Sequence, residues 1–543
     1  MTERQQSRDR LGRVFTWLCG GALALNLLLA IGLLALIARH GMAYFWQSPV
    51  AEAKLHDGST LIGEIHGWEN VPESEAAWPG ERRMRLKIGN RDLYGLDFRW
   101  VRDSEVAALS YPADVVLLER LEWGNFYGRM SALRRGEEII ASGGDAVWNA
   151  FGASHDRKLA QRRDVEALEA GEIGRVNYEI EQLRLAERRA SLREHGATAA
   201  DTKERQRATA ETEARYEALA SRLFEMRERL RDETVVMTAA GGEEKSIAVG
   251  EIVRYLRPNA MSGWSSMTLY LGRVWEFVSG SPRESNTEGG IFPAIFGTVM
   301  MVFLMSFAVA PFGVLAALYL REYAKEGPLV RAVRIAVNNL AGVPSIVFGV
   351  FGLGFFVYMI GGTIDQLFYP EALPTPTYGT GGILWASLTL ALLTVPVVIV
   401  AAEEGLAAVP RIVREGSLAL GATKFETIWR VVLPAAGPGI LTGMILAMAR
   451  AAGEVAPLMI VGMVKLAPSL PVDGNFPYVH LERKFMHLGF HVYDVGFQSP
   501  NVEAAQPLVF ATALLLVVVV IAMNLVAVVV RNRVRRAYAT MAV

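Results

Sequence analysis

Six apolar runs, each long enough to cross a membrane, constrain this chain more than any other feature of its sequence. A helix needs about 20 apolar residues to cross the hydrocarbon core of a bilayer. The first run, residues 14–38, is longer than the apolar region of a signal peptide and ends without a small-residue cleavage site, so we expect an uncleaved span. The other runs cover residues 291–320, 337–360, 383–402, 437–464 and 506–530. We therefore predict a mainly α-helical membrane protein with six spans.

The basic residues next to the spans predict which side of the membrane each loop occupies, because cytoplasmic loops carry an excess of Lys and Arg. The excess comprises Arg321, Lys325, Arg331 and Arg334 after the second span, Arg411, Arg414, Lys424 and Arg430 after the fourth, and Arg531, Arg533, Arg535 and Arg536 after the sixth. We therefore expect a multi-pass protein of the inner membrane with both termini in the cytoplasm. Residues about 40–290 are then periplasmic, since a long outer loop crosses the membrane largely regardless of its charge.

The outer segment, residues 41–290, predicts a mixed α/β domain between an N-terminal span (1–40) and a membrane core (291–543). Short β-like runs bounded by turn residues predict small hairpins. These runs cover residues 53–56 and 60–66 around Asp57-Gly58, residues 84–88 before Gly89-Asn90, and residues 235–256 around Gly241-Gly242. Residues 157–231 are rich in Glu, Arg and Ala with few helix breakers, so we expect a long antiparallel helical hairpin that turns near Gly196.

Composition and spacing exclude several classes of protein. The formal net charge is −1 and the basic residues form no stripe, which argues against binding to nucleic acid. The single cysteine, Cys19, rules out an internal disulfide framework. Residues 241–246 lack the spacing of a phosphate-binding loop, so we expect no ATP site or other cofactor in this chain. His480, His487 and His491 share no zinc-ligand spacing, so we predict a structural role for them and no metal.

The segment between the fourth and fifth spans, residues 403–436, predicts two short helices separated by a turn. Gly421 suits the left-handed position that ends a helix. Thr423 and Glu426 form a capping box that starts the next helix, and Pro434 is expected to end it. Four apolar side chains would face water: Leu418, Leu420, Phe425 and Trp429. They predict a docking surface for a groove in a partner, with an ordinary amphipathic connector as the alternative.

This segment resembles the EAA loop of ABC importer permeases. The family pattern has a Glu, two small residues, a Gly six positions after the Glu, and Leu-Pro at a fixed distance. Gly416 and Ser417 depart from the two alanines of the pattern but are also small. The resemblance implies that this coupling loop docks into an ATP-binding subunit and passes the closure of that subunit to the spans. The residues with this implied role are Glu415, Gly416, Ser417, Leu420, Gly421, Ala422, Thr423, Leu433 and Pro434.

Arg450 and Glu454 place two charges in the fifth predicted span, near the middle of the bilayer. Charge there is costly, at least about 2.5–3.5 kcal/mol for an Arg at a helix centre. Four residues apart on a helix, the two side chains would share one face. We predict that they line a translocation pathway, where the Arg450 guanidinium meets a passing anion and Glu454 holds it. A buried ion pair that fixes helix packing is the alternative.

Small residues and a proline near the start of the third predicted span predict close helix packing and a bend. Ser345 and Gly349 lie four residues apart, a spacing that lets helix backbones approach each other. Pro344 interrupts the hydrogen bonding of the helix backbone, so we expect a hinge there. Close packing alone is the alternative explanation for these three residues.

Three segments, 342–349, 417–423 and 450–458, make the region from Ile291 onward similar to phosphate-specific transport permeases of the PstA type, in a long form with an N-terminal periplasmic extension. The resemblance implies a transport subunit that is not an enzyme and that translocates inorganic phosphate. It implies four kinds of partner besides membrane lipid: a homologous second permease of the PstC type, two copies of a PstB-type subunit that uses ATP and Mg, and a PstS-type periplasmic phosphate-binding protein. The alternatives are a permease for sulfate or molybdate, and a membrane sensor or scaffold whose outer domain binds a partner.

Overall fold

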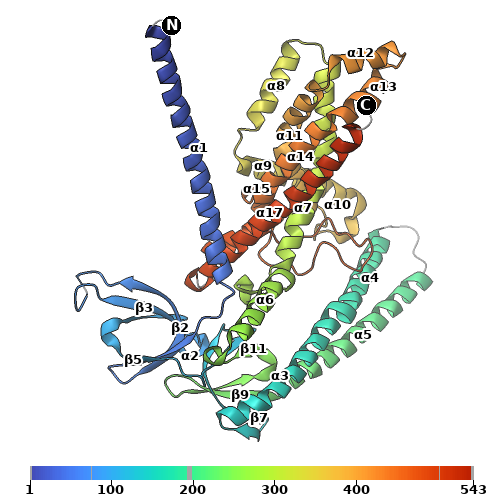
Figure 1. The fold of residues 1–543 in the computed structure, drawn as a ribbon. Helices are drawn as coiled ribbons and strands as arrows, with labels where there is room; N and C mark the ends of the chain where they lie inside the picture. The colour runs from blue at the N-terminus through green and yellow to red at the C-terminus, as the bar shows by residue number, and fades with distance from the viewer. Residues whose placement is uncertain (1–2, 75, 193–198, 500–501, 540–543) are drawn as a thin grey trace.

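A bundle of long helices forms one part of the molecule, and two β-sheets with a helical hairpin lie beyond one end of it (Figure 1). The computed structural model describes residues 3–74, 76–192, 199–499 and 502–539. The start of α1 (Glu3–Ala43) and the end of α17 (Val502–Ala539) lie at the end of the bundle away from the sheets. The predicted fold class, a mainly helical membrane protein with a mixed α/β domain, is confirmed.

Six helical segments among the described residues are long and apolar enough to cross a membrane. They are Phe15–Ala43, Phe292–Tyr323, Ser345–Phe368, Ile383–Ala407, Lys424–Gly453 and Ala504–Arg536. The second span consists of α7 (Phe292–Leu318) and η6 (Tyr319–Tyr323), and the third of α9 (Ser345–Phe351), η7 (Gly352–Gly361) and α10 (Gly362–Phe368). The fourth span is α11 (Ile383–Ala407). The fifth consists of α13 (Lys424–Glu426), η9 (Thr427–Val432) and α14 (Leu433–Gly453). The six predicted spans are therefore present, but the third and fifth differ from the prediction at their ends.

The third span begins later than predicted because Pro344 separates two helices. A separate amphipathic helix, α8 (Pro328–Leu340), precedes it and has no buried residue. The chain then turns, and Pro344 stands at the start of α9 with extended backbone angles, φ −56° and ψ 134°. A proline disfavours the helical conformation at the residue before it and supplies no N–H. Pro344 thus lies before the span and not at a bend within it.

The fifth span begins at Lys424 and ends at Gly453, earlier at both ends than predicted. Pro434 does not end the second helix of the coupling loop, because α13, η9 and α14 form one continuous helix through it. The segment η9 is π-helical and ends just before Leu433-Pro434. A π-helical turn has wider hydrogen-bond spacing than an α-helix, so it can accommodate a residue that lacks an N–H. A short helix, α15 (Ala456–Val461), follows the span. The second helix of the coupling loop and the fifth span are therefore one continuous helix.

Helix α11 lies at the centre of the core, where 67% of its most apolar stretch is buried. It packs against α7 and α14, and small residues permit this close approach. A Cβ atom on Gly313 of α7 would lie 2.6 Å from Val398 of α11, and one on Gly443 of α14 would lie 2.3 Å from Ala401. The corresponding stretch of α1 holds no buried residue, as expected for a helix whose solvent is lipid.

The first sheet of the outer domain is antiparallel, in the order β4-β3-β2-β1-β5. Its strands are β1 (Val50–Leu55), β2 (Thr60–Asn70), β3 (Arg82–Lys87), β4 (Phe98–Arg102) and β5 (Val106–Ser110). The predicted hairpin around Gly58, whose φ is 84°, is confirmed. The predicted hairpin after residues 84–88 is present as the antiparallel pair of β3 and β4, but a short helix, α2 (Arg91–Tyr94), makes the connection longer than a tight turn at Gly89-Asn90. The Asn90 side chain instead holds both backbone polar groups of Tyr127 in the second sheet, at 2.7 and 3.0 Å.

The second sheet has the order β10-β9-β7-β6-β11, with β8 beside β7. Its strands are β6 (Val116–Arg120), β7 (Phe126–Arg135), β8 (Glu138–Ser142), β9 (Glu233–Thr238), β10 (Glu244–Ala248) and β11 (Ile252–Leu256). The predicted pair around Gly241-Gly242 is confirmed as the antiparallel pair of β9 and β10. A third strand, β11, crosses to the far edge of the sheet and pairs with β6.

The predicted helical hairpin is confirmed and begins earlier than expected, at Gly144. It consists of α3 (Gly144–Ala167), η2 (Leu168–Ile173), α4 (Gly174–Leu192) and α5 (Ala199–Arg231), and α4 runs beside α5 (Figure 1). Ion pairs cross between its two arms, among them Arg215 with Glu179 at 3.3 Å. The predicted turn at Gly196 lies outside the described residues.

Among the described residues, two contacts between the outer domain and the core stand out. Helix α6 (Gly263–Ser279) leads into α7 through β12 (Pro282–Arg283) and β13 (Glu288–Gly289), and the Ile291 N–H donates to the Phe277 carbonyl at 2.8 Å. In the second, α4 contacts two outer loops of the core. Arg189 pairs with the buried Glu371 of η8 (Pro370–Ala372), with Nε 2.9 Å from Oε1. The Tyr178 hydroxyl donates to the Phe476 carbonyl at 2.7 Å.

Candidate functional site

The coupling loop is built by local conformational preferences. Its first helix, α12 (Arg411–Ala419), ends at Gly421, which has φ 90° as predicted. The second helix starts at Thr423, whose hydroxyl accepts from the Glu426 N–H at 3.3 Å while the Glu426 carboxylate accepts from the Thr423 N–H at 2.9 Å. Both halves of the predicted capping box are therefore present.

The predicted apolar surface of the coupling loop is exposed. Leu420, next to the turn, is 92% exposed, and Phe425 and Trp429 are more than half exposed. The rings of Phe425 and Trp429 stack with their centres 6.1 Å apart. Ile412, at the start of α12, is also largely exposed and adds a further apolar side chain to the loop. Sequence reasoning missed Ile412, although its place on the same short amphipathic helix as Leu418 could have indicated it.

The coupling loop is fixed to the end of the second span. Arg414 of α12 pairs with Glu322 of η6. Lys424 donates to the Glu322 carbonyl at 2.5 Å, and its ammonium lies 4.8 Å from the ring centre of Tyr323. Sequence reasoning missed these contacts, since no local pattern links residue 322 to residues about a hundred positions later. A movement of the loop would therefore displace the end of α7 as well as α14.

The other predicted coupling residues divide between the exposed surface and the body of the core. Glu415 and Gly416 are exposed on α12, while Ala422 is half-buried. The Ser417 hydroxyl lies 2.9 Å from the hydroxyl of Thr427, which joins the two helices of the loop. Leu433 packs into an apolar cluster at this end of the core, and Pro434 beside it is half-buried.

Arg450 and Glu454 meet at the opposite end of the same continuous helix. Arg450 Nε lies 3.5 Å from Glu454 Oε1, and both side chains are half-buried. Arg450 belongs to the last turn of α14, whereas Glu454 follows the helix with extended backbone angles, φ −79° and ψ 131°. The two side chains therefore do not share one helical face. The chain leaves the helix there because Gly453 ends helices readily and Pro457 begins a new one.

Gly349 lets α9 lie directly against α15. A Cβ atom at Gly349 would lie 2.7 Å from the Pro457 Cα, closer than side chains pack. Ser345 stands one turn earlier, in the first turn of α9, directly after Pro344. The structure thus brings the predicted packing residues of the third span to the segment that follows the Arg450 and Glu454 pair.

The three histidines of the last outer loop do not converge on one point. His480 lies between two carboxylates, with Nε2 3.0 Å from Asp473 and Nδ1 3.2 Å from Glu482. His487 and His491, at and within α16 (Leu488–Tyr493), are buried, and burial lowers the pKa of each to about 4, with Lys465 adding to the effect at His491. Both are therefore neutral at ordinary pH.

Comparisons with known proteins agree with this arrangement. A family model described as "Binding-protein-dependent transport system inner membrane component" matches residues 309–536. The match therefore includes the end of α7, the coupling loop and the Arg450 and Glu454 pair, and excludes the outer domain.

Among curated relatives, the probable phosphate transport system permease protein PstA of Methanocaldococcus jannaschii is 32% identical over 44% of this chain and 74% of its own length. Phosphate transport system permease protein PstA 1 of Mycobacterium tuberculosis is 34% identical over 45% of this chain and 71% of its own length. The probable ABC transporter permease protein YqgH of Bacillus subtilis is 32% identical over 36% of this chain, and the match spans only 59% of that protein.

Among solved structures, an inward-facing form of the MetNI methionine ABC transporter matches 50% of this chain and 99% of its own chain, with 19% identity and a TM-score of 0.34. The curated relatives are permease subunits and not enzymes. This chain belongs to the family of binding-protein-dependent ABC transporter permeases and, within it, to the permeases of the PstA type.

Proposed function

We propose that this chain is a permease subunit of an ATP-driven importer that carries inorganic phosphate across the inner membrane. The observation that supports this substrate is the similarity to phosphate permeases. Two of them share 32% and 34% identity with this chain over 74% and 71% of their own lengths. The six spans support a multi-pass location in the membrane.

The proposed pathway runs beside Arg450 and Glu454. A guanidinium offers paired N–H donors that match the oxygens of a tetrahedral anion. The Arg450 side chain is 36% exposed and its partner carboxylate is 3.5 Å away, so a passing phosphate can compete for the same donors. Glu454 would keep the arginine in place when no anion is present.

The proposed input is a push on the coupling loop by an ATP-binding subunit. The exposed Leu420, Phe425 and Trp429 would enter a groove in that subunit. Phe425 lies near one end of the continuous helix Lys424–Gly453, and Arg450 lies near the other. With a rise of about 1.5 Å per residue, such a helix carries a displacement over roughly 40 Å without an intervening joint.

The proposal also includes the other subunits of the importer. They are a second permease of the PstC type, two PstB-type subunits that use ATP and Mg, and a PstS-type phosphate-binding protein in the periplasm. In this proposal the chain itself binds no cofactor. Both termini and the coupling loop face the cytoplasm, and the domain 41–290 faces the periplasm, as the distribution of basic residues predicts.

Uptake of labelled phosphate and sulfate tests this function in cells that lack their own phosphate system and express this chain with its partner subunits. We expect phosphate uptake by the wild type, loss of most of it in Arg450→Ala, and partial retention in Arg450→Lys. Arg533→Ala is the matched control, because Arg533 is an exposed arginine near the end of α17. Uptake of sulfate without phosphate would overturn the substrate. Uptake of neither, at normal membrane levels of the assembled subunits, would favour a sensor or scaffold.

A further inference from the structure

A cavity of about 560 Å³ lies where the outer domain meets the outer ends of the spans. This volume is within the range of roughly 300–1,000 Å³ that is typical of small-molecule sites. Its walls come from the end of α1 and the chain after it, from β2, β3 and α6, and from the start of α17. Apart from the start of α17, the walls of the cavity lie outside the region matched by the family model.

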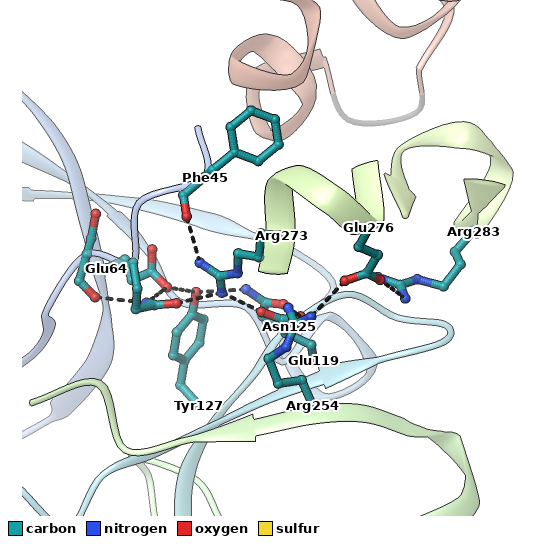
Figure 2. Close-up of polar contacts among 11 residues, drawn as sticks. Phe45, Glu64, Glu119, Asn125, Tyr127, Arg254, Arg273, Glu276 and Arg283 are labelled. Carbon is teal, nitrogen blue, oxygen red and sulfur yellow. Dashed lines mark hydrogen bonds and ion pairs between the residues drawn. The ribbon is translucent and has the colours of Figure 1, made fainter. Parts of the chain in front are cut away.

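One wall of the cavity is a chain of ion pairs (Figure 2). Arg273 pairs with Glu119, which also accepts from Arg254 at 2.8 Å. Arg254 in turn donates to Glu276 at 2.7 Å, and Glu276 accepts from Arg283 at 2.7 Å. Three guanidinium groups thus share two carboxylates, which leaves one positive charge on this wall.

A second wall adds two cations from β3. Arg85 and Lys87 alternate with Leu86, so both side chains leave the same face of the strand. Within the part of the chain that the structure describes, neither has a carboxylate oxygen within 4.0 Å, and the Arg85 Nε has no hydrogen-bond partner. Burial together with Lys87 and Arg85 lowers the pKa of the neighbouring His66 to about 4, in agreement with a positive field in the cavity.

Two further carboxylates line the cavity, and one of them, Glu288, interacts electrostatically with Lys87. Glu64 accepts from the Tyr127 hydroxyl and from the Gln47 amide, each at 3.0 Å. Burial raises the pKa of Glu288, which favours its neutral form. Even with every carboxylate ionised, the lining holds five cations against four anions.

We propose that this cavity binds an anion through its phosphate group, with Arg85 and Lys87 as the principal ligands. Arginine offers paired donors to phosphate oxygens and lysine a point charge. Two sources supply this chemistry, the headgroup of an anionic lipid and free phosphate. Tyr44 and Trp46, just beyond the end of the first span, line the same cavity, as does Phe510 of α17. Tyr and Trp are enriched at the level of lipid headgroups, so the cavity is within reach of the outer leaflet.

The lipid arm of the test uses the assembled transporter in nanodiscs of phosphatidylcholine with added phosphatidylglycerol, and counts retained lipids by native mass spectrometry. We expect Lys87→Gln and Arg85→Gln each to weaken retention of phosphatidylglycerol about tenfold, as for the loss of one charge-assisted hydrogen bond. Arg83→Gln is the control: it lies on the same face of β3 but pairs with Glu69 at 3.0 Å and does not line the cavity.

The second arm measures binding of labelled inorganic phosphate by equilibrium dialysis in nanodiscs of phosphatidylcholine alone. The Arg450→Ala background separates this cavity from the proposed transport pathway. Phosphate binding that persists in Arg450→Ala and falls about tenfold on addition of Lys87→Gln supports the cavity with free phosphate as its ligand. If neither probe binds more weakly to Lys87→Gln and Arg85→Gln than to Arg83→Gln, the proposal is overturned, whatever the uptake assay shows.

Discussion

At the scale of single residues, backbone conformation distinguishes two glycines of the coupling loop that have equally open surroundings. A Cβ atom at either Gly416 or Gly421 would meet no other atom within 4 Å. Gly421 nevertheless has φ 90°, in the left-handed region, whereas Gly416 lies within α12. A side chain at Gly421 would therefore act through backbone strain alone, and one at Gly416 would cause none.

We expect Gly421→Ala to destabilise the turn of the coupling loop by about 1–2 kcal/mol, the cost of the left-handed conformation for a residue with a Cβ. Gly416→Ala should stabilise α12 by about 0.5–1 kcal/mol, because alanine loses less backbone entropy. Hydrogen exchange of the α12 amides measures both changes, and co-purification of the ATP-binding subunit reports docking. Equal exchange in the two variants would contradict this explanation.

At the scale of elements, the packing of α9 against α15 depends on the absence of a side chain at one position. Gly349 faces the backbone of Pro457, where a Cβ atom would approach to 2.7 Å. Gly354, in the same span, faces open space. Because Pro457 closely follows Glu454, a displacement of α15 would also move the charged pair.

The variant Gly349→Ala should lower the free energy of unfolding by about 1–3 kcal/mol, the usual cost of forcing extra atoms into a close contact. Gly354→Ala is the control, and it should be neutral or slightly stabilising, since it adds the same methyl group without a contact. Thermal unfolding of the full chain in detergent measures both. A Gly349→Ala variant as stable as Gly354→Ala would show that α15 can move aside at little cost.

At the scale of the whole molecule, apolar packing and charge together hold the outer domain to the core. The chain of ion pairs around Arg273 and Arg254 joins the second sheet to α6, which leads into the second span. On the other side of the domain, Arg189 of the helical hairpin reaches Glu371, which is only 2% exposed. These two attachments predict that the domain moves with the spans and not independently of them.

The ion pair between Arg189 and Glu371 predicts how three variants will differ in hydrogen exchange. Arg189→Ala should raise hydrogen exchange in α4, because a buried carboxylate then loses a cation that compensates its charge. The double variant Arg189→Ala with Glu371→Gln should recover part of the protection, since no buried charge remains. Arg188→Ala, which removes an exposed neighbouring arginine, should leave exchange unchanged. Equal exchange in all three would mean that this ion pair does not hold the hairpin.

The ion-pair chain predicts loss of stability in acid. Burial would raise the pKa of Glu119, but Arg273 and Arg254 outweigh it and hold this pKa below its usual value. Stability from Glu119 is therefore complete above the ordinary glutamate pKa of about 4.3 and is lost as the pH falls below it. The unfolding temperature should fall less between pH 6 and pH 3 in Glu119→Gln than in the wild type. Glu122→Gln, at an exposed neighbour, should behave as the wild type does.

The sequence by itself determined the features that depend on neighbouring residues. The number of spans follows from the lengths of the apolar runs, and the capping box at Thr423 and the left-handed Gly421 follow from preferences that act over a few residues. For the same reason the hairpin of β1 and β2 could be predicted from Asp57-Gly58. In each case the interacting groups are close together along the chain.

Only the tertiary structure decided which distant residues meet. Arg414 pairs with Glu322 across 92 positions, and Arg189 reaches Glu371 across 182 positions. The helix that continues through Pro434, and the cavity between the outer domain and the ends of the spans, also depend on such packing. A local pattern could not reveal them, because the free energy of each contact depends on how the whole chain packs around it, which a few neighbouring residues do not contain.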